Sequence, residues 1–167
     1  MTIFLNLFRR DSIFIVFIHD RDCFTMTIEQ DIVNNCVCQK VRAAARAVTC
    51  AYDGALRPVR LRATQLAVLA AVGVEGSVSI TALAYELGMD RTTLSRNLGP
   101  LQKAGLINVG AESWRRSRTL EITEKGRSRL TEAFPLWQKA QKALRRKLGV
   151  GEFDNVRNGL GLLMDAY

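Results

Sequence analysis

The sequence predicts a mainly α-helical fold with one small β-hairpin, an α+β arrangement in which long terminal helices flank a compact lobe. Apolar residues recur at steps of three and four through most of the chain, which is the spacing of one buried helix face. Two short apolar segments flank a turn at residues 110–117, as in a β-hairpin. The 167 residues, 48% of them hydrophobic, suffice for one lobe and its flanking helices.

The first 25 residues differ in composition from the rest of the chain. They hold five of the seven phenylalanines, and their apolar run from Ile13 to Ile18 is followed by charged residues, without the small-residue cleavage site of a secretory signal. We expect Met26 to be the functional start and residues 1–25 to be an extension without function. The intact mass of the native protein tests this, since a species that retains residues 1–25 would contradict it.

Residues 26–56 are predicted to form one long N-terminal helix. Its apolar positions fall at steps of three and four, which places them on one face. They are Val33, Val37, Val41, Ala44, Val48, Ala51 and Ala55.

A helix-turn-helix pattern lies within the predicted lobe, residues 57–130. The segment Ile80–Leu87 has helical apolar spacing and ends at Gly88. Asp90 then offers a carboxylate to the first amides of a second helix. The buried stripe of that second helix is predicted to be Leu94, Leu98 and Leu101.

The other side of this second helix carries short polar side chains and two guanidinium groups. These residue types reach base edges and phosphates in the major groove of DNA. The sequence therefore predicts a DNA-reading helix. Its predicted DNA-binding residues are Arg91, Thr92, Thr93, Ser95, Arg96 and Asn97.

A basic β-hairpin is predicted to follow, with strands around 106–109 and 119–122. Nine basic and three acidic residues between 91 and 129 give a net charge of +6 out of +8 for the chain, as a nucleic-acid footprint requires. The hairpin arginines that are placed to enter the minor groove are Arg115, Arg116 and Arg118.

These segments resemble, in order, the MarR (multiple antibiotic resistance regulator) family of winged helix-turn-helix repressors. Leu61–Val72 is similar to the helix that leads into the DNA-binding lobe, Ser79–Ile107 to the helix-turn-helix, and Arg115–Gly126 to the wing and its exit. The resemblance covers roughly residues 27–167. One departure is Trp114, which stands where the family has an Asp that orients the arginine matched by Arg116.

Residues 131–167 are predicted to form C-terminal dimerisation helices, the first starting near Pro135. A lobe of about 65 residues is too small to cover these apolar stripes and that of residues 26–56. We therefore expect a homodimer, with packing inside a monomer as the alternative, and the resemblance likewise implies a two-fold dimer. Such a dimer implies a pseudo-palindromic operator in double-stranded DNA. The C-terminal stripes are Trp137, Ala140, Leu144 and Leu148, then Phe153, Val156, Leu160 and Leu163.

The four cysteines indicate a reducing, cytoplasmic setting rather than a disulfide framework. On one helix, Cys36 and Cys38 would point about 200° apart and would neither pair nor chelate. The only histidine is His19, so no metal or other cofactor is predicted. Resemblance to the organic-peroxide-sensing branch of the family implies a sensor role for Cys38. Tyr52 matches one of the two tyrosines that surround the sensor cysteine in that branch, and Ala63 stands in place of the other. The alternative is that the cysteines have no chemical role and only fill space on a helix.

Other classes of protein fit the sequence less well. No catalytic motif is present, and a thiol peroxidase that uses Cys38 would be the enzymatic alternative. No segment has the roughly 20 apolar residues needed to cross a bilayer. A winged-helix module that binds protein has no use for so many exposed arginines. We therefore expect a transcriptional regulator, most simply a repressor that a small effector or a peroxide releases from DNA, and no enzyme.

Overall fold

The structure, a computed structural model, describes residues 27–110 and 119–166. The chain divides into two compact units, residues 1–40 and 41–167. Each unit is described by itself.

In the first unit, helix α1 (Ile28–Asn35) begins with a reciprocal pair of hydrogen bonds. The Gln30 amide donates to the Thr27 hydroxyl at 3.3 Å, and the Thr27 amide donates to the Gln30 side chain at 2.9 Å. This capping box satisfies two amides that a helix start leaves unpaired.

The prediction of one continuous N-terminal helix was wrong, because the chain leaves helical geometry at Cys36. Cys36 has φ −66° and ψ 108°, and the next helix, α2, runs from Val37 to Leu56. Two asparagines, which are weak helix formers, precede the break. The apolar side chains beside it, Val33 and Val37, are exposed, so no buried packing holds the helix together across this point.

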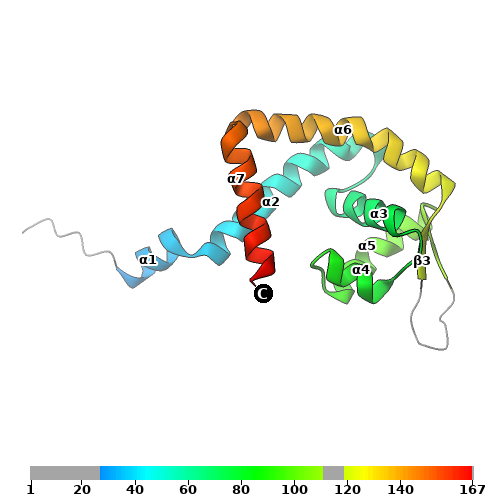
Figure 1. The fold of residues 1–167 in the computed structure, drawn as a ribbon, viewed down its shortest axis with the longest axis horizontal. Helices are drawn as coiled ribbons and strands as arrows, with labels where there is room; N and C mark the ends of the chain where they lie inside the picture. The colour runs from blue at the N-terminus through cyan, green and yellow to red at the C-terminus, as the bar shows by residue number, and fades with distance from the viewer. Residues whose placement is uncertain (1–26, 111–118, 167) are drawn as a thin grey trace, which may run out of the picture. The chain divides into compact units, whose positions relative to one another are not determined.

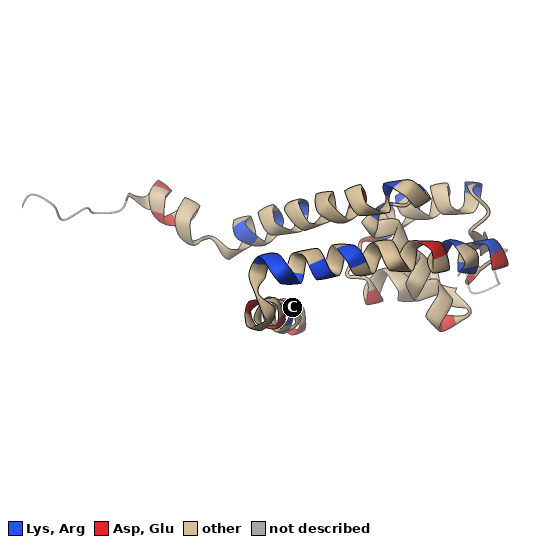
Figure 2. Ribbon diagram, turned by 90° about the horizontal axis from the view of Figure 1, so that it is seen from above, with Lys and Arg blue, Asp and Glu red and all other residues tan. Residues whose placement is uncertain are grey.

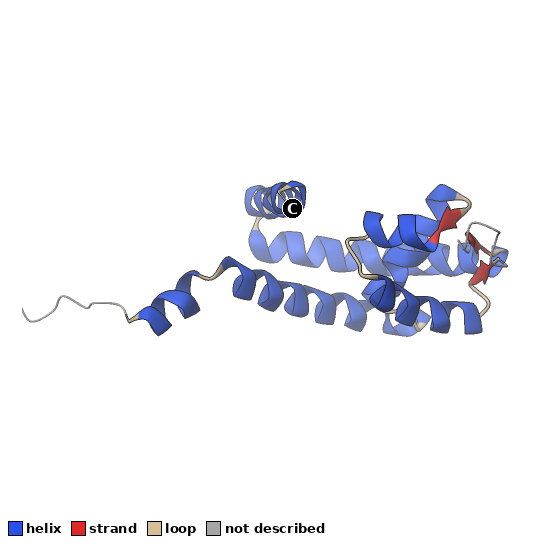
Figure 3. Ribbon diagram, turned by 90° about the horizontal axis from the view of Figure 1, so that it is seen from below, coloured by secondary structure: helices blue, strands red, loops and turns tan. Residues whose placement is uncertain are grey.

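The second unit is a helical lobe with a three-stranded sheet at one end and a long helix across it (Figures 1 and 3). α3 lies at its centre and contacts α4, α5, α6 and β3. After α2, its elements are a 3-10 turn η1 (Arg57–Val59), α3 (Ala63–Glu75), β1 (Val78–Ser79), α4 (Ile80–Glu86), α5 (Arg91–Lys103), β2 (Ile107–Val109), β3 (Thr119–Ile122), α6 (Glu124–Leu148) and α7 (Val150–Asp165).

The predicted helix-turn-helix is confirmed as α4 and α5. The hydroxyl of Ser79 caps α4 by accepting from the Ala82 amide at 3.1 Å. At its other end Gly88 has φ +58°, and the Met89 amide donates to the carbonyl of Ala84 at 2.8 Å. This is the glycine-terminated end that the sequence indicated, since a residue without Cβ takes a positive φ at no steric cost.

The two predicted strands pair antiparallel as β2 and β3, with Ile107 opposite Ile122. The hairpin tip, residues 111–118, lies outside the described residues. A third strand, β1, was not predicted, because two residues are too few to show a strand period. It pairs with β3, so the sheet order is β1-β3-β2 and the strand before α4 is joined to the hairpin.

The core joins α3, the two helices of the motif and the sheet. It is apolar throughout, and within the described residues no charged or polar side chain is buried. The predicted leucine stripe of α5 forms part of it. The largest fully buried side chains are Leu56, Leu69, Leu83, Leu94, Leu101, Leu106, Ile107, Leu120, Val68 and Val72.

The expectation that a C-terminal helix starts near Pro135 was wrong, because α6 starts at Glu124 and passes through Pro135. The Thr123 hydroxyl caps it by accepting from the Gly126 amide at 3.0 Å. Proline lacks the amide that would bond to the carbonyl four residues earlier, which bends a helix. α6 curves along its length in Figure 1.

Gly126 fixes the first turn of α6 against the sheet. A Cβ at this position would lie 2.1 Å from the carbonyl oxygen of Leu106 and 2.8 Å from a side-chain carbon of Ile122. Only glycine allows α6 to approach the chain entering β2 this closely.

We expect Gly126→Ala to lower the free energy of unfolding by about 3 kcal/mol, because the backbone of Leu106 must move away. Gly99→Ala is the control, since its new Cβ meets no atom within 4 Å. It should raise stability by about 0.5–1 kcal/mol through helix propensity. Urea denaturation measures both variants, and equal effects would contradict the packing argument.

Candidate nucleic-acid interface

The orientation of α5 follows from its buried leucines. Leu94, Leu98 and Leu101 are all buried on one side of the helix. At 3.6 residues per turn, the opposite side carries positions at steps of four and three, and all of them are exposed. These residues, which we call the outward stripe of α5, are Thr92, Arg96, Gly99 and Lys103.

Asp90 caps the start of α5 and also holds Thr93. Its carboxylate accepts from the Thr93 amide at 2.8 Å and from the Thr93 hydroxyl at 2.6 Å. These two bonds hold the pKa of the Asp90 carboxyl below its ordinary value, and the charge of Arg96 adds to the effect. The hydroxyl of Thr93 is thus committed to the helix start in this structure.

Asn97 ties α5 to α3. Its side-chain oxygen accepts from the hydroxyl of Thr64 at 2.9 Å, and its side-chain nitrogen donates to the carbonyl of Thr93 at 2.9 Å. Both ends of the amide are used, and the side chain is half-buried. This contact could not be predicted, because Thr64 lies 33 residues before Asn97 in the chain.

Arg91 and Ser95 lie on a flank of the helix between the buried and outward sides. Both are exposed, and the Ser95 hydroxyl donates to the Arg91 carbonyl at 2.7 Å. Of the six helix residues predicted to bind DNA, Thr92 and Arg96 therefore lie on the outward stripe, and Lys103 joins them from outside the predicted set.

The three wing arginines, Arg115, Arg116 and Arg118, lie outside the described residues, as does Trp114. The strands that lead to them are described, and Gly110 and Thr119 close the base through a 2.8 Å backbone hydrogen bond. Basic residues continue after the sheet, along α6 (Figure 2).

Cys38 is exposed, and Cys36 is half-buried. The expectation that they point about 200° apart on one helix was wrong, because Cys36 lies outside both α1 and α2. In the second unit, Cys50 is also exposed, and the Tyr52 hydroxyl donates to the side chain of Gln141 at 2.8 Å. Partial burial raises the pKa of Tyr52. Among the described residues no group of three or more His, Cys, Asp or Glu could hold a metal ion.

The fold is that of a winged helix-turn-helix transcriptional regulator. A family described as a helix-turn-helix domain matches residues 61–110. The transcriptional regulator MosR from M. tuberculosis, solved in complex with DNA, is 38% identical, with 78% of this chain and 95% of MosR covered and a TM-score of 0.71. No protein with a curated description matches the chain.

More distant solved structures share the fold. A mutant of MarR from E. coli, complexed with operator DNA, is 17% identical over 80% of this chain and 96% of its own, with a TM-score of 0.69. A MarR-family regulator from Rhodococcus sp. RHA1 is 20% identical over 86% and 99%, with a TM-score of 0.67. The chain belongs to the MarR family of winged helix-turn-helix transcriptional regulators, whose members are not enzymes.

Within the residues that the structure describes, the helices are all too short or too polar to span a membrane.

Asn97→Ala should lower the free energy of unfolding by about 1 kcal/mol, because it removes the bond between α5 and α3. Arg96→Ala should change it by less than about 0.5 kcal/mol, since Arg96 is exposed. Chemical denaturation of both variants measures the contrast. A larger loss for Arg96→Ala than for Asn97→Ala would contradict the conclusion that Asn97 holds α5 against α3.

The lowered pKa of Asp90 predicts a pH dependence. Stabilisation by this carboxylate is present above the pKa of the unfolded state, about 4, and is lost as the pH falls through the lower pKa of the folded state. Asp90→Asn keeps a capping oxygen but does not titrate. Thermal unfolding between pH 7 and pH 2 should therefore show a smaller loss of stability for the variant, and identical profiles would contradict the assignment.

Proposed function

We propose that this chain is a homodimeric, sequence-specific DNA-binding repressor that acts in the cytoplasm on a pseudo-palindromic operator. The observation that carries the proposal is the outward stripe of α5, which offers Thr92, Arg96 and Lys103 to a groove while Leu94 and its neighbours hold the helix from behind. The 38% identity to MosR, which was solved in complex with DNA, supports it.

In this proposal the helix residues divide into three groups. Thr92 and Arg96 contact base edges, and Arg91, Ser95 and Lys103 contact phosphates along the groove. Thr93 and Asn97 hold α5 in position through their bonds to Asp90 and Thr64. Arg115, Arg116 and Arg118 of the wing contact the neighbouring minor groove.

A second copy of the chain would cover the apolar surface that the second unit leaves open. None of the residues of α7 is buried, and its apolar side chains lie open to solvent. Val156 is 48%, Leu162 72% and Met164 69% exposed. Exposed apolar side chains gathered on one terminal helix are typical of a protein interface. A two-fold dimer would present two α5 helices to half-sites about one helical turn apart.

A change in the distance between the two α5 helices of the dimer would release the protein from DNA, because both helices must bind their half-sites at the same time. A small effector is one signal and oxidation of Cys38 is another. In the second case, the Cys38 thiolate attacks a hydroperoxide, takes one oxygen to become a sulfenic acid, and releases the alcohol after protonation. The exposure of Cys38 meets the requirement for access.

The test of sequence-specific binding is a competition assay at physiological salt, with DNA from upstream of the gene against a scrambled duplex. We expect a preference of about a thousandfold or more. Arg96→Ala should cost about 1–3 kcal/mol of binding and relax the preference, because one base-reading side chain is lost. Equal, salt-sensitive binding to both duplexes would favour a non-specific basic protein, and no binding to either would favour a protein-interaction module.

A peroxide titration of the same DNA complex tests the cysteine. Cys38→Ser should bind DNA as the wild type does and lose the response to cumene hydroperoxide. Cys50→Ser is the matched control, since Cys50 is also an exposed thiol on α2. A response that survives in Cys38→Ser would contradict the sensor assignment.

Leu160→Asp, on α7, tests the dimer. Leu160 is 46% exposed in the single chain, so the substitution should leave the fold intact. If a second copy covers it, sedimentation should show monomers at concentrations where the wild type is dimeric, because a buried charge is costly. Sedimentation of the wild-type protein as a monomer would contradict the proposed dimer.

A further inference from the structure

A small hollow in the second unit lies where α3, the last turn of α5 and the start of α6 meet. Its volume is about 240 Å³. Part of its wall is apolar and part is cationic. The residues that matter for its chemistry are Arg60, Leu61, Pro100, Leu101, Lys125 and Arg129.

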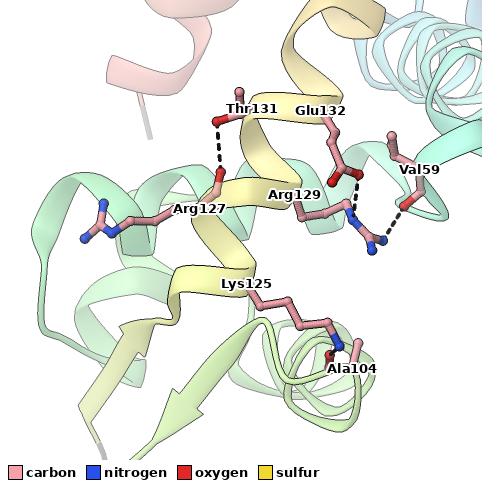
Figure 4. A network of polar contacts seen from close by, with 7 residues as sticks. All are labelled: Val59, Ala104, Lys125, Arg127, Arg129, Thr131 and Glu132. Atoms are coloured by element: carbon pink, nitrogen blue, oxygen red, sulfur yellow. Dashed lines mark hydrogen bonds and ion pairs between the residues drawn. The ribbon is translucent and has the colours of Figure 1, made fainter.

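Two of the three cations come from one side of α6. Lys125 and Arg129 are one helical turn apart and extend to the same side, whereas Arg127 between them extends to the other (Figure 4). The Lys125 ammonium donates to the carbonyl of Ala104 at 2.8 Å, and Nη1 of Arg129 donates to the carbonyl of Val59 at 2.8 Å. These bonds hold both cations at the hollow and leave N–H groups on each to spare.

Little negative charge balances these groups. Among the described residues that line the hollow none is acidic, and the Glu132 carboxylate meets Arg129 only at Nε, 3.2 Å away. Arg60 has no hydrogen bond or ion pair from its side chain to any residue of the described chain. Three cations that line one hollow without a carboxylate favour an anion in it.

The backbone conformation of Arg60 decides where its side chain leaves the chain. Arg60 has φ +55° and ψ +36°, and it is the one described residue other than glycine with a positive φ. This left-handed conformation ends the 3-10 turn η1, where the Arg60 amide donates to the carbonyl of Arg57 at 3.0 Å, and glycine would adopt it at a lower steric cost.

We propose that this hollow binds a small organic phosphate, a phosphomonoester with a compact apolar body. The two guanidinium groups and one ammonium match the two charges and three terminal oxygens of a phosphomonoester. Leu61, Pro100 and Leu101 supply an apolar wall for its organic part. A volume of about 240 Å³ admits a single small ring and its phosphate but excludes a nucleic-acid strand.

Occupancy of the hollow would act on α5. Ala104, whose carbonyl accepts from Lys125, is the residue at which α5 ends. A phosphate bound through the spare N–H groups of Lys125 shares the ammonium with that carbonyl and offsets the positive charge that Lys125 places at the negative end of the helix dipole. The ligand would therefore change how α5 is held against α6, and this second half of the inference rests on the proposed function.

Titration calorimetry of the full-length chain with phenyl phosphate tests the site without DNA. We expect saturable binding that is at least about tenfold tighter than that of inorganic phosphate, because the ring contacts the apolar wall. Benzyl alcohol, which lacks the charges, should not bind. Equal affinity for phenyl phosphate and inorganic phosphate, or no saturable binding of phenyl phosphate, would overturn the inference.

Substitutions locate the site. Arg60→Gly and Lys125→Met should each weaken phenyl phosphate binding about tenfold or more. Arg60→Gly also relieves the positive φ, so it should fold at least as well as the wild type. Arg127→Gln is the matched control, an arginine of the same helix turn that extends away from the hollow. An equal loss in Arg127→Gln would mean that only the diffuse charge of the lobe attracts the ligand, and the site would be refuted.

DNA competition in the presence of phenyl phosphate tests the coupling. The ligand should weaken DNA binding by the wild type and leave that of Arg60→Gly unchanged. If the protein has no preferred DNA, the proposed function fails while the calorimetry still decides the site. Tight phosphate binding without any effect on preferred DNA would refute the coupling alone.

Discussion

Burial of one side of α5 determines which of its polar side chains are exposed to solvent. Leu94, Leu98 and Leu101 enter the core shared with α3 and the sheet, so the rotation of α5 about its own axis is fixed. Each leucine removed from water contributes about 1.5–3 kcal/mol, far more than any single surface contact. The positions of the polar residues of α5 follow from this rotation. Thr92 and Arg96 face outward, and Asn97 forms a hydrogen bond with Thr64 of α3.

The second constraint is the close approach at Gly126. It joins the start of α6 to the chain entering β2, and the Thr123 amide adds a 3.1 Å bond to the carbonyl of Leu106 at the same place. The sheet, the end of α5 and the start of α6 are therefore held as one block. Anything that alters the hydrogen bonds around Ala104 or Leu106 acts on the base of the wing and on the end of α5 together.

The sequence was informative where structure is encoded locally. The leucine stripe, the cap at Asp90 and the stop at Gly88 depend on neighbouring residues, and all three were predicted. The break at Cys36 could not be predicted, because the apolar period continues through it. Nor could β1, which exists only through its pairing with β3, or the bond between Thr64 and Asn97, which joins residues that meet only in the folded chain. Pro135 misled because proline marks helix starts more often than helix interiors.

The unbroken course of α6 has a mechanical meaning. Its 25 residues extend for about 38 Å along one curved helix, with one end fixed beside the sheet at Gly126 and the other leading into α7. A tilt of about 10° at the fixed end moves the far end by roughly 6 Å, given that length. A small tilt of α6 at the sheet thus becomes a large displacement of α7. Conversely, a large displacement of α7 corresponds to only a small tilt of α6 at the sheet.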